Sequence, residues 1–158
     1  ARYMDQPITP LYAFGHGLSY TRFSYGEPSV DRSRIPANGG EVTITLDVTN
    51  TGARAGDEVV QLYMRDPVAS ISRPVQQLRG FKRVALQPGE TKRVFFTLSA
   101  DQFALWSRDG GWVIEPGKIE LMVGSASDDI RGRAAVTIDG EGRGSIAPAA
   151  IPTRSKVK

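Results

Sequence analysis

Apolar and polar residues alternate with a period of two through the middle of the chain, as they do in half-buried β-strands. The alternation recurs over residues 42–48, 60–64, 94–98 and 119–123, and a short final stretch covers 136–138. Turn-forming residues separate these stretches, as in Asn38-Gly39-Gly40, Asn50-Thr51-Gly52, Gln87-Pro88-Gly89-Glu90, Asp109-Gly110-Gly111 and Glu115-Pro116-Gly117. The spacing predicts an all-β fold, an antiparallel β-sandwich of about seven strands, with one helical turn over 99–105.

The same alternation predicts which side chains fill the core of the sandwich. Seven apolar residues should face inward: Ile44, Leu46, Leu62, Phe96, Leu98, Leu121 and Val123. Thr43 and Thr45 should face the other way, because successive side chains of a strand point to opposite faces. A register shifted by one residue would exchange the two sets.

Length and composition agree with one globular domain. The chain has 158 residues, of which 40% are hydrophobic and 23% charged. It has no cysteine and a single histidine, so we expect no disulfide, no metal site and no cofactor. No apolar run approaches the roughly 18 residues that a membrane helix needs, and we expect no membrane contact.

The net charge of +3 comes from the carboxyl-terminal part of the chain. Residues 143–158 contain four basic residues and no acidic one, so the rest of the chain is close to neutral. We therefore expect no nucleic-acid partner, although a basic tail could touch an acidic surface. The content of Ala, Pro, Ser and Gly predicts that residues 141–158 form a flexible basic tail.

Residues 10–23 are apolar without following the strand period. They gather five ring-bearing side chains around Gly15 and Gly17: Tyr12, Phe14, His16, Tyr20 and Phe23. Glycines spaced in this way suit a tight backbone path with positive φ. Such an apolar segment outside a periodic element should dock on something, and we interpret it as a connector from a domain upstream of residue 1.

The connector resembles the linker of family 3 glycoside hydrolases, the β-glucosidase and β-xylosidase group, in the form that ends in a fibronectin type III-like domain. Further matching motifs follow in order, namely Val48-Thr49-Asn50-Thr51-Gly52, residues 55–63, Ser72-Arg73-Pro74-Val75, residues 78–84, residues 86–91, residues 113–124 and Ser127-Asp128-Asp129-Ile130-Arg131. The resemblance implies three parts: a connector over 1–24, a fibronectin type III-like or immunoglobulin-like sandwich over 25–140, and the tail over 141–158.

The family's nucleophile motif Ser-Asp-Trp and its Lys-His substrate motif are both absent from this chain. Glycosidases need a pair of carboxyl groups, but no acid stands out, because Asp57, Glu58, Asp128 and Asp129 all adjoin predicted turns. We expect no catalytic residue here. The resemblance implies a parent enzyme, periplasmic or secreted, whose upstream domains hydrolyse terminal β-linked sugars with retention. The carbohydrate would be met only through that parent, and the parent could be a homodimer.

The interface with the catalytic domains is expected at the connector and at the loop over 70–74. Its candidate residues are Tyr12, Phe14, His16, Leu18, Tyr20, Phe23, Ser72 and Arg73. The ring of His16 could equally be packed in the connector with its nitrogens bonded to backbone. For the loop, the alternatives are a purely structural role and a contact with substrate.

Two other functions stay open. Trp106 and Trp112 could stack on sugar rings and make the chain a carbohydrate-binding module, or they could pack across a β-hairpin. A generic interaction sandwich unrelated to sugar is the third alternative. Exposure of the indole rings separates the first two.

We predict that the isolated chain does not hydrolyse aryl β-glucosides or aryl β-xylosides, because the nucleophile motif is missing. Assays with the purified chain check this. Turnover that disappears when one of its carboxylates is replaced by the amide would contradict it.

Overall fold

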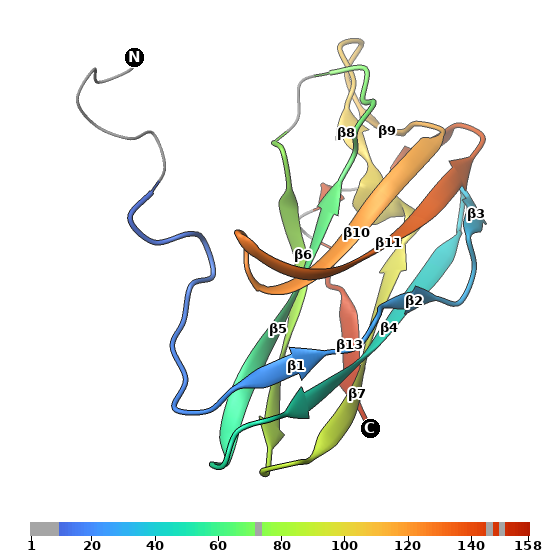
Figure 1. Ribbon diagram of the computed structural model, residues 1–158. Coiled ribbons are helices and arrows are strands. Elements are labelled where there is room, and N and C mark those ends of the chain that lie inside the picture. The colour runs from blue at the N-terminus through green and yellow to red at the C-terminus, as the bar shows by residue number, and fades with distance from the viewer. Residues whose placement is uncertain (1–9, 72–73, 145–146, 149–150) are drawn as a thin grey trace.

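Two sheets of five strands pack face to face and enclose the apolar core, with a small third sheet at one end (Figure 1). The computed structural model describes residues 10–71, 74–144, 147–148 and 151–158. No helix in these ranges is long and apolar enough to cross a membrane. The predicted fold class, an all-β sandwich, is confirmed.

The first sheet is built around β4, and its strands are β1 (Phe23–Tyr25), β2 (Ser29–Val30), β4 (Glu41–Asn50), β7 (Thr91–Ser99) and β13 (Arg154–Val157). The strand order is β1-β4-β7-β13, and β2 also pairs with β4. All four pairings are antiparallel.

The second sheet has the order β3-β11-β10-β5-β6. Its strands are β3 (Arg34–Pro36), β5 (Gly56–Arg65), β6 (Gln77–Leu86), β10 (Gly117–Ala126) and β11 (Asp129–Asp139). Only β3 runs parallel to its neighbour, β11. The third sheet contains β8 (Leu105–Trp106), β9 (Trp112–Ile114) and β12 (Gly142–Gly144).

The predicted register is correct. All seven residues expected in the core are at most 2% exposed. Thr43 faces away from the core, and its hydroxyl lies 3.0 Å from that of Thr97 on the neighbouring strand. Six long strands of 9–11 residues carry this core. The short strands around them escape the periodicity, because two to four residues are too few to show it.

The predicted helical turn is a single turn of 3-10 helix, η1 (Ala100–Phe103), preceded by Ser99. The amide of Ser99 donates to Oε1 of Gln102 at 3.0 Å, which satisfies a backbone group at the helix start. Gln102 is buried, and so is Phe103, so the turn covers the end of the core.

The prediction of a flexible tail over 141–158 is wrong for two segments of it. β12 pairs with β9, and β13 pairs with β7. Composition favoured disorder because this part of the chain is rich in Ala, Pro, Ser and Gly. It could not show that the edge of β7 offers unpaired backbone groups, which a chain of almost any sequence can satisfy by pairing.

Neighbouring phenylalanines on β7 provide a test of the core. Phe96 is fully buried, while Phe95 faces outward and is half-buried. We expect Phe96→Ala to lower the free energy of unfolding by about 3–5 kcal/mol, because it leaves a cavity between the sheets. Phe95→Ala should cost less than half of that. Urea denaturation of both variants measures the difference, and equal losses would contradict the register.

Candidate functional site

The backbone of the connector is fastened to the second sheet at Phe14 and Gly15. The carbonyl oxygen of Phe14 accepts hydrogen bonds from the Ser127 amide at 2.9 Å and from the Tyr63 hydroxyl at 3.4 Å. The carbonyl oxygen of Gly15 accepts from Nε2 of Gln61 at 3.0 Å. Because Gln61 and Tyr63 belong to β5 and Ser127 follows β10, this first anchor joins the connector to two strands.

Gln61 is the centre of the first anchor and is only 5% exposed. Its Nε2 also donates to the Ser125 carbonyl, and its Oε1 accepts from the Tyr63 hydroxyl at 2.5 Å. Gly15 has φ +82°, and a Cβ there would lie 2.1 Å from Oε1 of Gln61. Glycine is therefore required at this position by conformation and by space. The positive φ predicted for Gly17 as well is wrong.

A second anchor holds the connector just before β1. The Thr21 hydroxyl donates to Oδ1 of Asn50 at 2.7 Å, and the Thr51 amide donates to the Arg22 carbonyl at 2.8 Å. Asn50 is completely buried, and its Nδ2 also bonds to the Leu86 carbonyl at 3.1 Å. The Asn50 amide also accepts from the Gly52 amide at 3.0 Å and donates to the Arg54 carbonyl at 2.7 Å, so a fully bonded buried side chain holds the connector at Thr21.

The large side chains of the connector point into solvent although its backbone is anchored. The exposed fractions are 90% for Leu11, 67% for Tyr12, 66% for Phe14, 94% for Leu18 and 93% for Tyr20. This exposure was expected for a segment that docks elsewhere. An exposed apolar group of this size on a fixed backbone is typical of an interface.

Two other residues of the predicted interface lie differently. Phe23 is half-buried against the core, because it opens β1 and pairs with β4. His16 is exposed, with its ring centroid 5.1 Å from that of Tyr12. Ser72 and Arg73 lie outside the described residues. Next to them, the Ser70 amide donates to Oε2 of Glu115 at 3.0 Å, so the loop is tied to the end of β9.

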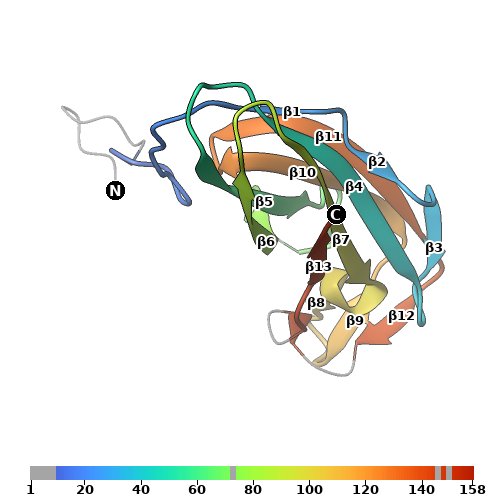
Figure 2. The same ribbon diagram turned by 90° about the horizontal axis from the view of Figure 1, so that it is seen from below.

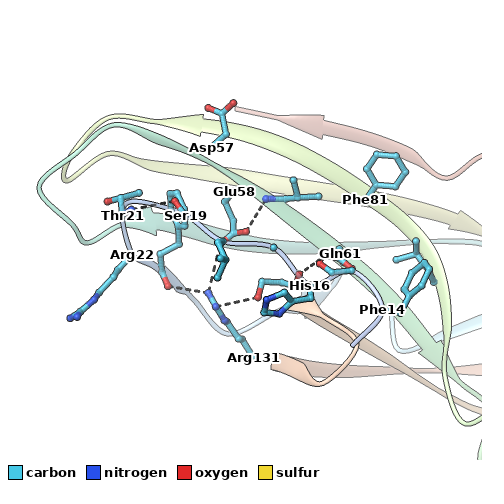
Figure 3. A pocket seen from close by; sticks show the side chains of 17 residues that line it. Phe14, His16, Ser19, Thr21, Arg22, Asp57, Glu58, Gln61, Phe81 and Arg131 are labelled. Atoms are coloured by element: carbon cyan, nitrogen blue, oxygen red, sulfur yellow. Dashed lines mark hydrogen bonds and ion pairs between the residues drawn. The ribbon is translucent and has the colours of Figure 1, made fainter. Parts of the chain in front are cut away.

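The outer face of β5 and β6 continues the apolar surface. A groove of about 690 Å³ runs between the connector and these strands, lined among others by Phe14, Leu18, Val59 and Phe81 (Figure 3). Val59 is 39% exposed and Phe81 is 64% exposed. We call Leu11, Tyr12, Phe14, Leu18, Tyr20, Val59 and Phe81 together the docking surface. Val59 and Phe81 were not among the predicted interface residues, although the outward parity of Val59 beside Val60 is visible in the sequence.

The side chain of Arg131 on β11 holds the polar end of the groove (Figure 3). Its Nη2 lies 2.6 Å from Oδ2 of Asp129, and its Nη1 donates to the Phe23 carbonyl at 3.1 Å. The guanidinium also stacks over the Tyr25 ring, with Cζ 4.8 Å from the centroid. Arg131 therefore ties the start of β1 to β11, which sets where the connector leaves the sandwich.

The pKa values of two carboxyl groups beside Arg131 are shifted in opposite directions. The Glu58 side chain is only 12% exposed, and burial raises its pKa although Arg131 lies 3.8 Å away. Hydrogen bonds from Arg131 and from the Ser125 hydroxyl lower the pKa of Asp129. Burial also raises the pKa of the nearby Tyr25 hydroxyl. Glu58 has one further bond, from the Val59 amide at 2.8 Å.

The tryptophans form a cross-strand pair. Trp106 of β8 lies opposite Trp112 of β9, and their rings meet edge to face at 5.3 Å and 78°. This is the hairpin packing that the sequence allowed. Trp106 nevertheless stays 55% exposed. Among the described residues, no group of three His, Cys, Asp or Glu side chains could hold a metal ion.

Comparisons with known proteins agree with this architecture. Residues 58–127 match the fibronectin type III-like domain. The chain is 48% identical over 132 residues to a β-xylosidase from Formosa agariphila, covering 82% of this chain and 18% of that enzyme. It is 40% identical over 131 residues to a periplasmic β-glucosidase from Salmonella typhimurium, covering 83% of this chain and 17% of that enzyme. The structure of a β-glucosidase from Erythrobacter marinus superimposes with a TM-score of 0.80 at 43% identity, over 87% of this chain and 18% of that one.

The sandwich with its anchored apolar segment is thus a fibronectin type III-like domain. It belongs to the fibronectin type III-like domains of the β-glucosidases and β-xylosidases of glycoside hydrolase family 3. The chain spans less than a fifth of the length of these relatives.

The charged groups predict two opposite dependences of stability on pH. The folded protein holds the Glu58 proton more tightly than the unfolded chain does, so Glu58 favours folding below its ordinary pKa of 4.5 and loses this contribution as the pH rises through the raised pKa. We expect the stability of Glu58→Gln, relative to wild type, to increase between about pH 4 and pH 7. Urea denaturation across this range measures the trend.

Asp129→Asn is the matched control with the reverse sign. The lowered pKa of Asp129 stabilises the fold above its ordinary value of 3.8, and this contribution is lost as the pH falls through the lowered pKa. The variant should be less stable by about 1 kcal/mol at pH 7, since the pair is half-exposed, and the difference should vanish in strong acid. If both variants show the same pH trend, the assignment of the two shifts is wrong.

Proposed function

We propose that this chain is a non-catalytic structural module that braces the catalytic domains of a β-glycosidase. The single observation that supports it is an apolar docking surface displayed on a backbone that two hydrogen-bonded anchors hold in place. In this proposal residues 1–24 are the connector and residues 25–140 the sandwich that supports it. The chemistry, retaining hydrolysis of terminal β-linked sugars, belongs to the upstream domains.

The anchors reduce the conformational-entropy cost of docking. Fixing the backbone of a free segment costs about 1–2 kcal/mol per residue, and here much of that cost is already met within the sandwich. Burying each large apolar side chain of the docking surface would then contribute roughly 1.5–3 kcal/mol. Leu18 and Tyr20 lie between the two anchors, and both side chains are more than 90% exposed.

The relatives suggest the setting in which the module works. The similar enzymes are β-xylosidases and β-glucosidases, and one of them is named periplasmic. We infer for this chain a parent hydrolase with catalytic domains as the partner of the docking surface, in the periplasm or outside the cell. Sugar would be bound by the parent, and pairing of two parents is compatible with the same architecture.

A sugar platform at Trp106 is the second candidate function. Its indole is half-exposed, and a hollow beside it is lined by Gln77 and Arg79, whose side chains bond to each other at 2.7 Å. An exposed ring next to amide and guanidinium groups is the arrangement that sugars use. Titration with cello- and xylo-oligosaccharides, comparing wild type with Trp106→Ala, decides whether this platform binds.

The docking role predicts that one substitution has different effects in two settings. In the isolated chain Phe14 is exposed, so Phe14→Ala should change the free energy of unfolding by less than about 1 kcal/mol. In the full-length enzyme the ring would be buried, and the loss should approach about 3–5 kcal/mol. Turnover per titrated active site should change little. Thermal and chemical unfolding of both forms provide the comparison.

Phe95→Ala is the control, because Phe95 lies on the outer face of β7, on the first sheet, whereas the docking surface lies over β5 and β6 of the second. It should destabilise the isolated chain and the full-length enzyme equally. A large loss of turnover in Phe14→Ala without a change in melting temperature would show that the connector shapes the active site directly. That result would contradict a purely structural role.

A further inference from the structure

The segment over residues 151–158, which we call the strap, lies along β7 of the first sheet and beside β6 of the second (Figure 2). Its strand β13 pairs with β7, and the pairing continues at Lys158, whose amide and carbonyl bond to Arg93 at 2.9 and 2.8 Å. On its other side the strap contacts β6, the last strand of the second sheet. One segment therefore bridges both sheets.

The side chains of the strap alternate in agreement with the sandwich. Val157 turns inward and packs against the core. Arg154 and Lys156 turn outward, where Arg154 meets Glu41 at 2.6 Å and Lys156 lies 4.9 Å from the Phe95 ring centroid. Basic side chains on an edge strand hinder the addition of another strand. The strap thus completes the first sheet.

Thr153 attaches the strap to an irregularity in β6. Leu62 of β5 lies opposite Gly80, but Tyr63 lies opposite Leu78, so Arg79 is the extra residue of a β-bulge. The carbonyl oxygen of Arg79 accepts a hydrogen bond from the Thr153 hydroxyl. The same hydroxyl accepts from Nε2 of Gln102, at 2.8 Å.

Gly80 provides the space for Thr153. A Cβ at Gly80 would lie 2.9 Å from Cγ2 of Thr153 and 3.0 Å from its Cβ, whereas its nearest contact to Phe96 would be an ordinary 3.4 Å. Gly80 is not in the left-handed region, so glycine is needed here for room and not for conformation. The missing side chain of Gly80 and the Arg79 carbonyl, which accepts the hydrogen bond from Thr153, together form a seat for one small β-branched hydroxyl residue.

We propose that the edge of β7 and the seat on β6 form a strand-binding site, whose ligand is the chain's own strap with Thr153 as its plug. The plug fixes the bulge of β6 from inside the sandwich. Phe81 is the next residue and points to the opposite face, where it is part of the docking surface. Resting on the proposed function for that last step, we infer that the strap holds the docking surface in its shape.

Hydrogen exchange of the full 158-residue chain tests this with four variants. Thr153→Val keeps the shape of the plug and removes the hydroxyl, while Thr153→Ser keeps the hydroxyl. We expect the amides of β13 to exchange about tenfold faster in Thr153→Val and in Gly80→Ala, and nearly as in wild type in Thr153→Ser. The double variant Gly80→Ala with Thr153→Ser should recover most of the protection that Gly80→Ala loses.

The amides at 80–82 of β6 should accelerate together with those of β13, while those of β10 stay protected. Unchanged exchange of β13 in Thr153→Val would contradict the claim that the Thr153 hydroxyl holds the strap. Failure of Thr153→Ser to rescue Gly80→Ala would contradict the claim that Gly80 makes room for Thr153. Faster exchange confined to the amides of β13 would contradict the inference that the strap holds Phe81 of β6 in position.

A dimer that grows with protein concentration would show that the strap of a second copy fills the site, which would overturn closure within one chain. If Gly80→Ala does not fold, the two Thr153 variants alone still decide the question. Because no catalytic domain takes part in these measurements, their failure is separate from a failure of the docking proposal.

Discussion

The buried amide of Gln61 is the interaction on which the position of the connector depends. Its two ends bond to the connector at Gly15, to the end of β10 at Ser125 and to the Tyr63 hydroxyl within β5. A buried amide must have all its partners, because an unpaired one costs about 1–3 kcal/mol. The connector therefore has one position on the sandwich, and its apolar side chains have one arrangement in space.

Anchoring explains how an apolar segment can stay ordered while its side chains face solvent. Burial does not hold Phe14 or Tyr20, since both are mostly exposed. Hydrogen bonds to the carbonyls of Phe14 and Gly15 hold one end of the segment. The other end is held by the Thr21 hydroxyl on Asn50 and by the Thr51 amide on the Arg22 carbonyl. The Arg131 side chain adds a charged contact to the Phe23 carbonyl at the exit of the connector. The result is an exposed apolar surface on a backbone that is already ordered, which is what the proposed docking requires.

Strand β6 contacts the strap on one face and lies beside the connector on the other. Its inner face receives the carboxyl-terminal strap at Gly80, and its outer face presents Phe81 beside the amino-terminal connector. Adjacent residues of one strand thus belong to two contacts that are far apart in sequence. The β-bulge suits β6 to this, because the carbonyl of its extra residue, Arg79, accepts a hydrogen bond from Thr153 of the strap.

The sequence alone determined the fold class, the register of the strands at 42–48, 60–64, 94–98 and 119–123, and the positions of the main turns. Alternation over five or more residues, as at 42–48 and 94–98, encodes which side faces the core, and the hydrophobic effect then leaves one register. The apolar connector was also visible, because its aromatic residues break that period. Family-like motifs in the right order identified the kind of domain.

Only the tertiary structure decided the rest. The docking surface includes Val59 and Phe81 because β5 and β6 happen to lie under the connector, a proximity that no local pattern encodes. The pKa of Glu58 is raised by burial, and Glu58 lies in a groove lined by the connector, β5 and Arg131 of β11, which are far apart in sequence. The tail became a strand because the edge of β7 had backbone groups to pair, and that demand resides in the partner strand and not in the sequence of the tail.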